Sequence, residues 1–394
     1  MKPFENIKVL DLTRVLAGPF STMILQEMGA EIIKIEVPEV GDDARQFGPF
    51  KNGKSAYFTS INRGKKSISL NLKSEKGKEI LKELIMKADL IVENFRPGTM
   101  EKLGLGYETI KKLNPRIVYA ACSGFGHTGP ESEKASYDIL AQAAGIMSIT
   151  GWPGNPPTRV GMSIADIGSG LYLTIGIMSA LYQQKVTGLG LKVDVSILDS
   201  QIGILENAIV RTQVENKAPE PIGNRHPTIT PFQAYKANDK WFVIAVGNDS
   251  LWKLFCKVIG KDDMGTNPKF STNKTRTENI IELNQILDSV FITKNSDEWL
   301  KLIDDAKIPC GPINSIDKLL VNEQANFRNM FVEVDDEKIG KIKVVGNPVK
   351  LSTLEEVNFR NPAPEIGENN YDILKQLLGY DSDYVDNLKK EGVL

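Results

Sequence analysis

Short apolar runs and amphipathic stretches follow one another through the N-terminal part of the chain. Residues 7–12 and 32–36 are apolar runs of strand length, and residues 20–28 between them have helical spacing. Gly29 stands where a helix can end, because glycine readily adopts the left-handed conformation that follows a last turn. A strand, a helix and a strand joined by short connections predict a β-α-β unit and therefore a parallel sheet.

The same alternation continues toward the middle of the chain. We expect further strands at 67–72, 90–93 and 117–121, with a helix at 76–87. This order predicts a large, doubly wound, Rossmann-like α/β domain. The glycine fingerprint of dinucleotide-binding folds is missing after the first strand, where residues 13–19 read TRVLAGP.

The pattern changes in the second half of the chain. Residues 171–184 are nearly all apolar and predict a buried helix, and residues 193–214 predict a long connecting helix. The stretch 219–223 has the proline and glycine content of a linker. Strands expected at 232–236 and 241–246, followed by helical segments, then predict a second, smaller α/β domain.

Composition fits a soluble globular protein of two domains. The chain has 394 residues, of which 41% are hydrophobic and 25% charged, as in ordinary globular proteins. Its formal net charge of −2 gives no basic surplus of the kind that nucleic-acid binding needs. We therefore expect no nucleic-acid partner. Three widely separated cysteines without metal-ligand spacing favour reduced thiols, and so a cytoplasmic location.

We also expect no membrane partner. No uninterrupted apolar stretch looks long enough to span a bilayer. Residues 1–6 lack the apolar core of a signal peptide.

Several kinds of active site are disfavoured. Only two histidines occur, His127 and His226, which argues against a histidine-ligated metal and against a histidine-based triad. The chain has neither a P-loop nor a nucleophile elbow. His127 lies in a glycine-rich loop and is interpreted as a hydrogen-bonding loop residue rather than as a general base. With so few histidines and no metal-ligand spacing among the cysteines, we expect no metal.

Asp166 is the acid that stands out. It is the only formally charged residue between Arg159 and Lys185, and small residues surround it. A carboxylate is costly to bury without a partner. Two interpretations stay open: the local pattern favours a cap for the helix beginning near Gly168, and the small neighbours suit a nucleophilic or proton-handling acid.

A second candidate site follows the strand expected at 90–93. Asn94, Phe95 and Arg96 stand at its C-terminal end, where open α/β sheets bind ligands. An amide, an aromatic ring and a guanidinium together suit an adenine nucleotide with phosphates. A solvated charged loop is equally compatible with this pattern.

Several segments, taken in order, resemble family III CoA-transferases, which include the formyl-CoA:oxalate, acetyl-CoA:oxalate and carnitine enzymes. The resemblance covers almost the whole chain and is carried by residues 7–19, 29–36, 41–45, 92–98, 137–143, 223–227 and 308–312. It implies an enzyme that exchanges CoA between an acyl-CoA (acetyl-, formyl- or succinyl-CoA) and a small carboxylic acid, with oxalate as the expected acceptor. It implies no prosthetic group, because coenzyme A and acyl-CoA act as substrates. Residues 223–227 and 245–249 look closest to the acetyl-CoA:oxalate and succinyl-CoA:dicarboxylate members.

The resemblance also implies an interlocked homodimer. In this arrangement a large CoA-binding domain at 1–215 is completed by residues 330–394, and a small domain spans 216–329.

The family's catalytic aspartate falls on Asp166. The resemblance implies that Asp166 attacks the acyl-CoA thioester and passes through a mixed anhydride and an aspartyl-CoA thioester. Gly247 and Asn248 are the candidates for binding the acyl group. The positions that the resemblance assigns to CoA binding are Val15, Leu16, Val37, Leu70, Asn71, Leu72, Lys73, Asn94, Phe95, Arg96, Lys102, Ala135, Ser136, Tyr137 and Asp138.

The related α-methylacyl-CoA racemases are the alternative. They carry a catalytic histidine where this chain has Tyr137, and without it two-base proton exchange lacks one partner. Leu16 and Val37 replace a glutamine and an arginine of the formyl-CoA:oxalate enzymes, which argues against formyl-CoA as the donor. A non-catalytic CoA-binding protein is the third interpretation, and it requires Asp166 to be only a cap.

Overall fold

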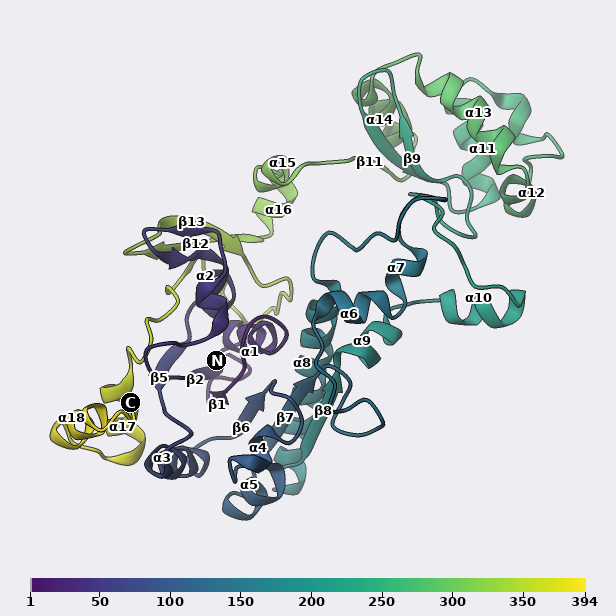
Figure 1. Cartoon of the computed structure of the whole chain (residues 1–394). Helices are drawn as coiled ribbons and strands as arrows, with labels where there is room; N and C mark the ends of the chain where they lie inside the picture. Colours follow the sequence, from purple (N-terminus) through teal and green to yellow (C-terminus); the bar gives the residue numbers. More distant parts are fainter. Residues whose placement is uncertain (1) are drawn as a thin grey trace. The chain divides into compact units, whose positions relative to one another are not determined.

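A computed structural model of the chain describes residues 2–394, which fall into two compact units (Figure 1). Unit 1 contains Met1–Ile146, Arg159–Lys217 and Glu323–Leu394. Unit 2 contains Met147–Thr158 and Ala218–Asn322. The domain boundaries at 215/216 and 329/330 stay a prediction; the units differ from them chiefly in grouping Met147–Thr158 with the smaller part.

A six-stranded, fully parallel sheet forms the centre of unit 1. Its order is β5-β2-β1-β6-β7-β8, so the chain winds outward from β1 in both directions. The strands are β1 (Lys8–Asp11), β2 (Glu31–Glu36), β5 (Lys66–Ser69), β6 (Leu90–Glu93), β7 (Val118–Ser123) and β8 (Lys192–Ser196). The predicted α/β class with a parallel sheet is confirmed, because most of these strands are the apolar runs that a sheet covered on both faces requires.

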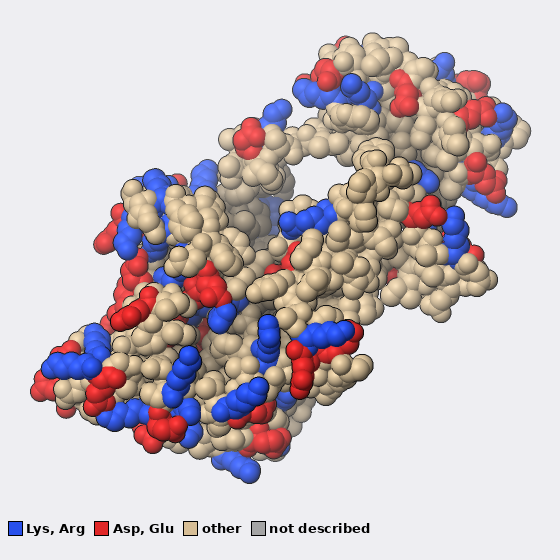
Figure 2. Space-filling model, in the orientation of Figure 1, with Lys and Arg blue, Asp and Glu red and all other residues tan. Residues whose placement is uncertain are grey.

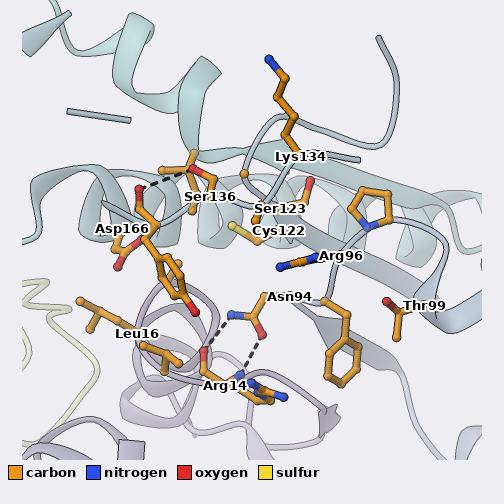
Figure 3. Close-up of a pocket in the computed structure, with 18 of the residues that line it drawn as sticks. Arg14, Leu16, Asn94, Arg96, Thr99, Cys122, Ser123, Lys134, Ser136 and Asp166 are labelled. Atoms are coloured by element: carbon orange, nitrogen blue, oxygen red, sulfur yellow. Dashed lines mark hydrogen bonds between the residues drawn. The ribbon is translucent and has the colours of Figure 1, made fainter. Parts of the chain in front are cut away.

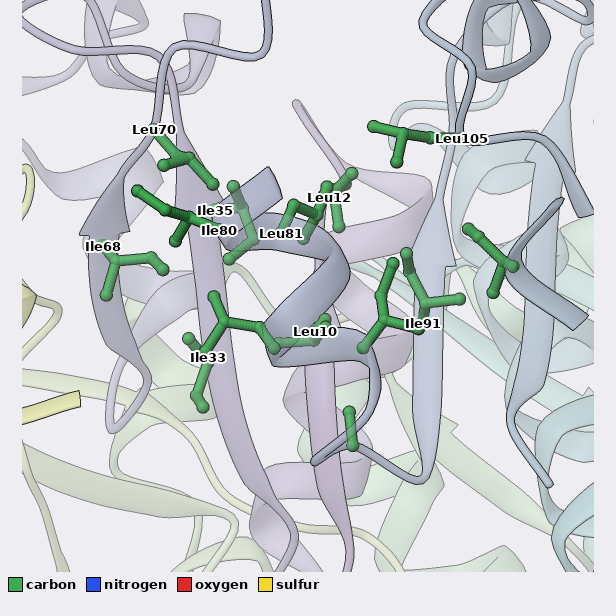
Figure 4. Packing of buried hydrophobic residues seen from close by; sticks show 14 of the residues in the cluster. Leu10, Leu12, Ile33, Ile35, Ile68, Leu70, Ile80, Leu81, Ile91 and Leu105 are labelled. Carbon is green, nitrogen blue, oxygen red and sulfur yellow. The ribbon is translucent and has the colours of Figure 1, made fainter. Parts of the chain in front are cut away.

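Helices cover both faces of this sheet. Alternate side chains of one strand point to opposite faces, so Leu10 joins one core cluster and Val9 the other. The Leu10 cluster lies between the sheet and helices α3 (Glu75–Ile85), α5 (Tyr107–Leu113), α17 (Asn370–Leu378) and α18 (Ser382–Lys390). Figure 4 shows the part of this cluster in which Ile80 and Leu81 of α3 lie over the strands. The Val9 cluster lies between the sheet and helices α1 (Ala17–Glu27), α6 (Asp138–Ala143), α8 (Ile164–Thr187) and α9 (Ile197–Gly203).

Helix α8 was predicted as a buried helix, and this is correct for one face only. Leu173 and Ile177 are fully buried against the sheet, whereas Ile175 is 58% and Tyr182 72% exposed. Contrary to the sequence-based expectation, α8 is long and apolar enough to cross a membrane by length and composition alone. Half of its most apolar window is buried inside the protein, as is usual for the core helix of a globular unit.

The long helix predicted over 193–214 is wrong. The segment begins as the edge strand β8, in which Val193 and Val195 pair with β7. Ser196 then caps α9 by accepting a hydrogen bond from the backbone N–H of Asp199 at 2.8 Å. A separate helix, α10, follows at Ala208–Glu215. The β-branched valines fit the open edge beside β7, and this pairing outweighed the helical spacing.

Short elements complete unit 1. A small sheet has the order β13-β12-β14, with β12 (Phe331–Asp336), β13 (Gly340–Val345) and β14 (Phe359–Arg360). The remaining elements of unit 1 are η1 (Asp43–Gln46), β3 (Phe50–Lys51), β4 (Lys54–Ser55), α2 (Ala56–Asn62), α4 (Thr99–Lys102) and α16 (Glu323–Phe327). The short helix α7 (Ile146–Ile149) spans the boundary between the units, with Met147–Ile149 in unit 2.

Unit 2 is built on a three-stranded antiparallel sheet. Its order is β11-β10-β9, and β9 (Phe232–Lys236) and β10 (Trp241–Ala245) are the two strands predicted there. Aromatic side chains dominate its core, with Phe291 in contact with the rings of Phe242 and Trp299. The other elements are α11 (Asp249–Val258), η2 (Asp262–Gly265), α12 (Asn273–Glu278), α13 (Ile280–Phe291), α14 (Ser296–Asp305), β11 (Cys310–Pro312) and α15 (Ile316–Leu320).

Candidate active site

A cavity of about 390 Å³ opens in unit 1 at the carboxyl ends of the parallel strands (Figure 3). Its walls come from the loops after β1 and β6, from the end of β7 and from the first turn of α8. The chain leaves β1 toward one side of the sheet and returns to β6 on the other side, so this is the point where the winding direction reverses. Ligands of open α/β sheets bind at such a point.

The cavity brings together predicted residues from four distant segments of the chain. Figure 3 shows Asp166 on the same side of the cavity as Leu16, with Thr99 on the opposite side. The predicted residues that line it are Val15, Leu16, Asn94, Phe95, Arg96, Ala135, Ser136, Tyr137 and Asp166.

Asp166 is the third residue of α8, and it does not cap that helix. The N-cap position is Ser163, whose side chain makes no capping bond. The backbone N–H groups of Ala165 and Asp166 donate instead to Asp138 Oδ1, at 2.9 and 3.4 Å. The cap interpretation of Asp166 is therefore wrong: Asp138 supplies the cap, and the Asp166 side chain lines the cavity.

The surroundings of Asp166 disfavour its charged form. Burial first, and the negative charge of Asp138 second, raise the pKa of Asp166 to about 7. The N-terminal end of α8 favours a negative charge and so acts in the opposite direction. A carboxyl with a pKa near neutrality is still substantially ionised there, and it is more basic than an ordinary aspartate.

Cys122 lies in the same cavity but is a poor competing nucleophile. Burial chiefly raises the pKa of its thiol to about 12, and the charge of Asp166 acts in the same direction. Because the thiolate is the reactive form, Cys122 stays an unreactive thiol at neutral pH. Cys122 therefore does not compete with the Asp166 carboxyl as a nucleophile at neutral pH.

Three cationic side chains, Arg14, Arg96 and Lys134, reach the cavity wall. Asn94 fixes the loop that carries Arg14: Asn94 Oδ1 accepts from the Arg14 N–H, and Asn94 Nδ2 donates to the Arg14 carbonyl, both at 2.8 Å (Figure 3). Over the face of the molecule seen in Figure 2, basic and acidic side chains are otherwise interspersed. The local cations suit an anionic ligand at this cavity.

Val15 has a strained backbone at the cavity wall. Its φ of 67° lies in the left-handed region, which is rare for a β-branched residue. Its N–H donates to Asp42 Oδ1 at 3.0 Å, and Asp42 forms a buried ion pair with Lys34 at 2.8 Å. Lys34 Nζ also donates to the Thr13 carbonyl at 2.7 Å. Buried groups beneath the cavity therefore hold this loop in place, as strained residues at functional sites require.

Five of the positions predicted to bind CoA lie away from this cavity, around strands β2 and β5. Leu70 is buried in the core, and Val37 is 54% exposed after β2. Asn71 donates from Nδ2 to the Gly392 carbonyl at 3.2 Å, and Leu72 packs against the core. Lys73 follows in the same loop. The structure does not bring these residues to the cavity, and their contact with CoA stays a prediction.

The other predicted residues outside the cavity have different surroundings. Lys102 ends the short helix α4. Asp138 is buried and uses both carboxylate oxygens inside the protein. Gly247 and Asn248 belong to unit 2, where Asn248 caps α11 by accepting from the Leu251 N–H at 2.9 Å. Their contacts with an acyl group stay a prediction.

Several cavity residues were not predicted. Most of them adjoin predicted positions or follow the ends of strands. This place in the sequence was the feature from which they could have been predicted. They are Arg14, Ala17, Asp43, Pro97, Thr99, Cys122, Ser123, Gly124, Lys134 and Ile197. Lys34 was also missed, although a lysine inside the apolar run 32–36 hinted at a buried charge partner.

His127 takes no part in this cavity. Its Nδ1 lies 3.1 Å from Lys192 Nζ, and its Nε2 lies 3.6 Å from Glu93 Oε1. No group of three or more His, Cys, Asp or Glu side chains within residues 2–394 is placed to hold a metal ion.

Comparison with known proteins gives the family. The family model for CoA-transferase family III matches residues 4–370. The chain belongs to CoA-transferase family III. The predicted family and the predicted enzyme class, a CoA-transferase, are therefore confirmed.

Individual members agree with this assignment. The transferase is 43% identical over 376 residues to acetyl-CoA:oxalate CoA-transferase of Acetobacter aceti, and the match spans 95% of each chain. It is 40% identical to succinyl-CoA:glutarate CoA-transferase of Mus musculus, over 100% of this chain and 91% of the mouse protein. The crystal structure of a CAIB/BAIF family protein from Brucella suis has a TM-score of 0.83 and 35% identity, covering 95% of this chain and 99% of that one. The racemase alternative is not favoured by these relatives.

Proposed function

We propose that this transferase moves CoA from an acyl-CoA, with acetyl-CoA first and formyl- or succinyl-CoA next, to a small carboxylic acid. The observation that supports this proposal best is that the Asp166 carboxyl lies in the cavity at the carboxyl edge of the sheet and has a raised pKa. Relatives named for oxalate and for glutarate share a dicarboxylate substrate. Oxalate is therefore the first acceptor to test.

In the first half of the proposed reaction, an Asp166 oxygen attacks the thioester carbonyl carbon of the donor. A C–O bond forms, the C–S bond breaks, and CoA leaves as its thiolate, so that Asp166 carries a mixed anhydride. The thiolate then attacks the Asp166 side-chain carbonyl. The donor acid leaves as a carboxylate, and Asp166 becomes an aspartyl-CoA thioester.

In the second half, the acceptor carboxylate attacks the aspartyl thioester and releases CoA thiolate. This forms a second anhydride between Asp166 and the acceptor. The thiolate attacks the acceptor's carbonyl carbon, which yields the new acyl-CoA and frees the Asp166 carboxylate. No proton is gained or lost over the cycle, so the reaction needs no histidine base.

Cationic side chains of the cavity would bind the CoA portion. Arg14, Arg96 and Lys134 offer positive charge to the phosphates of CoA. Backbone N–H groups at Gly247 and Asn248 are the proposed donors to the carbonyl oxygen of the acyl group. A cytoplasmic location is part of the same proposal, and it agrees with the free thiols of all three cysteines.

A homodimer is also part of the proposal. Ile175, Tyr182 and Val186 lie on α8 and are 58%, 72% and 68% exposed in the single chain. A contiguous apolar helix face of this kind is characteristic of an interface. A second copy of the chain is the occupant that the family resemblance implies.

Replacing Asp166 tests the covalent step. Asp166→Asn keeps the shape of the side chain but cannot form the anhydride, so we expect CoA transfer from acetyl-CoA to oxalate to fall by at least about 10³-fold. Hydroxylamine added during turnover should convert Asp166 of the wild-type enzyme to a hydroxamate, read by mass spectrometry of the peptide. Asp199→Asn, an exposed acid in the first turn of α9, is the matched control and should keep its activity. Full activity of Asp166→Asn would show that the covalent proposal is wrong.

The same assay identifies the substrates. Acetyl-, formyl- and succinyl-CoA would each be offered oxalate, formate, succinate, glutarate and carnitine, and new thioesters would be separated by chromatography. We expect the highest kcat/KM for acetyl-CoA with oxalate. A clear preference for another pair would reassign the donor or the acceptor, and exchange of an α-proton without CoA transfer would overturn the proposal.

A further inference from the structure

Helix α8 begins beside the proposed nucleophile without a cap of its own. Its first backbone N–H groups have no partners within the helix, as at every helix start. Asp138, which lies 27 residues earlier at the start of α6, accepts from two of them, the N–H groups of Ala165 and Asp166. The backbone of the nucleophile is thus held by a side chain from another helix.

Gln142, one turn further along α6, completes this support. Its Nε2 donates to Asp138 Oδ2 at 2.7 Å and to the Met162 carbonyl at 3.3 Å. Its Oε1 accepts from the Val160 N–H at 2.9 Å. Together, Asp138 and Gln142 hold the segment 160–166 along its whole length.

Both side chains are closed off from a ligand. Asp138 is 8% exposed and Gln142 0%. Both carboxylate oxygens of Asp138 accept bonds from the protein, and its Oδ2 also lies 3.7 Å from an Arg159 nitrogen. Asp138 does not line the cavity, so its chemistry is directed at the start of α8 rather than at CoA.

Asp138 also acts on Asp166 by its charge. A negative charge opposes the ionisation of a neighbouring carboxyl, and Asp138 is the charged residue that raises the pKa of Asp166 beyond the effect of burial. Other titratable or charged side chains line the cavity, act on its residues by charge, or lie on elements packed against α8. They are Arg14, Asp43, Tyr57, Arg96, Cys122, Lys134, Arg159, Lys192, Asp194 and Asp199.

We infer that Asp138, oriented by Gln142, is a positioning residue that fixes the backbone of Asp166 and keeps its carboxyl basic enough to attack a thioester. The inference rests on the proposed function, because it gives Asp138 a part in the covalent chemistry of Asp166. The predicted contact of Asp138 with CoA stays a prediction, and the inference does not depend on it.

The test is a titration of Asp166 that needs no turnover. A diazo reagent esterifies protonated carboxyl groups, and mass spectrometry of the peptide that contains Asp166 gives the extent of its esterification at each pH. Asp138→Asn keeps an oxygen for the two N–H groups but removes the charge. We expect the midpoint for Asp166 to move to lower pH by about 0.5–1 unit, together with the acid limb of kcat/KM.

The matched control is Asp199→Asn, which removes an exposed acid from α9 and should leave the midpoint unchanged. If Asp138→Asn folds normally but neither the midpoint nor the acid limb moves, Asp138 is only a helix cap and the inference is overturned. An activity loss with an unchanged pH profile would have the same meaning.

A second variant tests the inference if Asp138→Asn does not fold. In Asp138→Asn the new amide NH₂ would face Gln142 Nε2, so that two donors oppose each other. The double variant Asp138→Asn with Gln142→Glu restores a donor and an acceptor at this contact. It also moves the negative charge one helical turn along α6. We again expect a lower midpoint for Asp166, and a wild-type midpoint would contradict the inference. Because esterification does not depend on turnover, it separates this outcome from a failure of the proposed function, which Asp166→Asn activity would reveal.

Discussion

At the scale of single residues, the Asp166 carboxyl shows how a functional group lowers the stability of its own fold. Burial and the charge of Asp138 raise its pKa to about 7, against 3.8 for an ordinary aspartate. The folded state therefore holds this proton over a pH range in which the unfolded chain has already lost it. Stability from this group is fully present below about pH 4 and is lost as the pH rises through about 7.

Asp166→Asn should consequently stabilise the protein in a pH-dependent way. The amide carries no charge, so it avoids the cost of ionising a buried carboxyl. We expect the gain in free energy of unfolding over wild type to grow by roughly 2–3 kcal/mol between about pH 5 and about pH 8. Urea unfolding of both proteins at the two pH values measures it. An equal gain at both values would mean that Asp166 titrates normally in the folded state.

At the scale of elements, the position of Asp166 depends on how closely α8 packs against α1. A Cβ added at Gly170 would lie 2.8 Å from the Ala17 carbonyl oxygen and 3.0 Å from a ring carbon of Phe20. Because the Ala17 carbonyl belongs to the backbone of α1, it could make room for this Cβ only if one of the two helices moved. Two residues earlier, a Cβ at Gly168 would meet only the end of the Ile204 side chain, at 3.6 Å. The two glycines of one helix therefore have different functions.

Alanine at these two positions separates packing from helix propensity. Gly170→Ala should destabilise the protein by roughly 1–3 kcal/mol, since it overpacks the contact between the helices, and it should also lower CoA transfer. Gly168→Ala should stabilise it by up to about 1 kcal/mol, because alanine favours a helix interior and has room there. Urea unfolding of both variants provides the measurement. If Gly170→Ala is as stable as Gly168→Ala, the close approach of α1 and α8 is not a constraint.

The same elements show what the sequence could predict. The strand Leu90–Glu93 begins with three apolar residues, and a parallel sheet brings the carboxyl ends of its strands together, so Asn94, Phe95 and Arg96 were placed at a site from local pattern alone. The helix expected at 193–214 failed because Val193 and Val195 pair with β7, far away in the chain. A local sequence pattern contains no information about a partner strand so far away in the chain.

The roles of the supporting residues were hidden for a similar reason. The cap of α8 comes from Asp138 on another helix, whereas the local pattern had favoured Asp166 as the cap. The ion pair of Lys34 and Asp42 beneath Val15 likewise joins a strand to a later loop. A sequence shows which residue types are present, but the three-dimensional arrangement decides which of them act on each other.

At the scale of the whole molecule, the exposed apolar face of α8 is difficult to reconcile with a protein that stays a single chain. Leu171, Ile175 and Tyr182 recur along one side of a helix whose other side is buried. Leaving such a face in water forgoes the free energy of burying it, about 25 cal/mol for each Å². The proposed homodimer would cover this face with a second copy.

Sedimentation equilibrium of the wild-type protein should therefore give twice the mass of one chain, 43.6 kDa. Ile175→Glu places a charge in the middle of the apolar face, and we expect it to shift the protein toward single chains or to reduce the folded yield, because an unpaired charge is costly to bury. Ile281→Glu, at an isolated exposed position on α13 of unit 2, is the control and should remain dimeric. A wild-type protein that sediments as one chain at micromolar concentration and still transfers CoA would show that the homodimer proposal is wrong, and that α8 keeps its apolar face in solution.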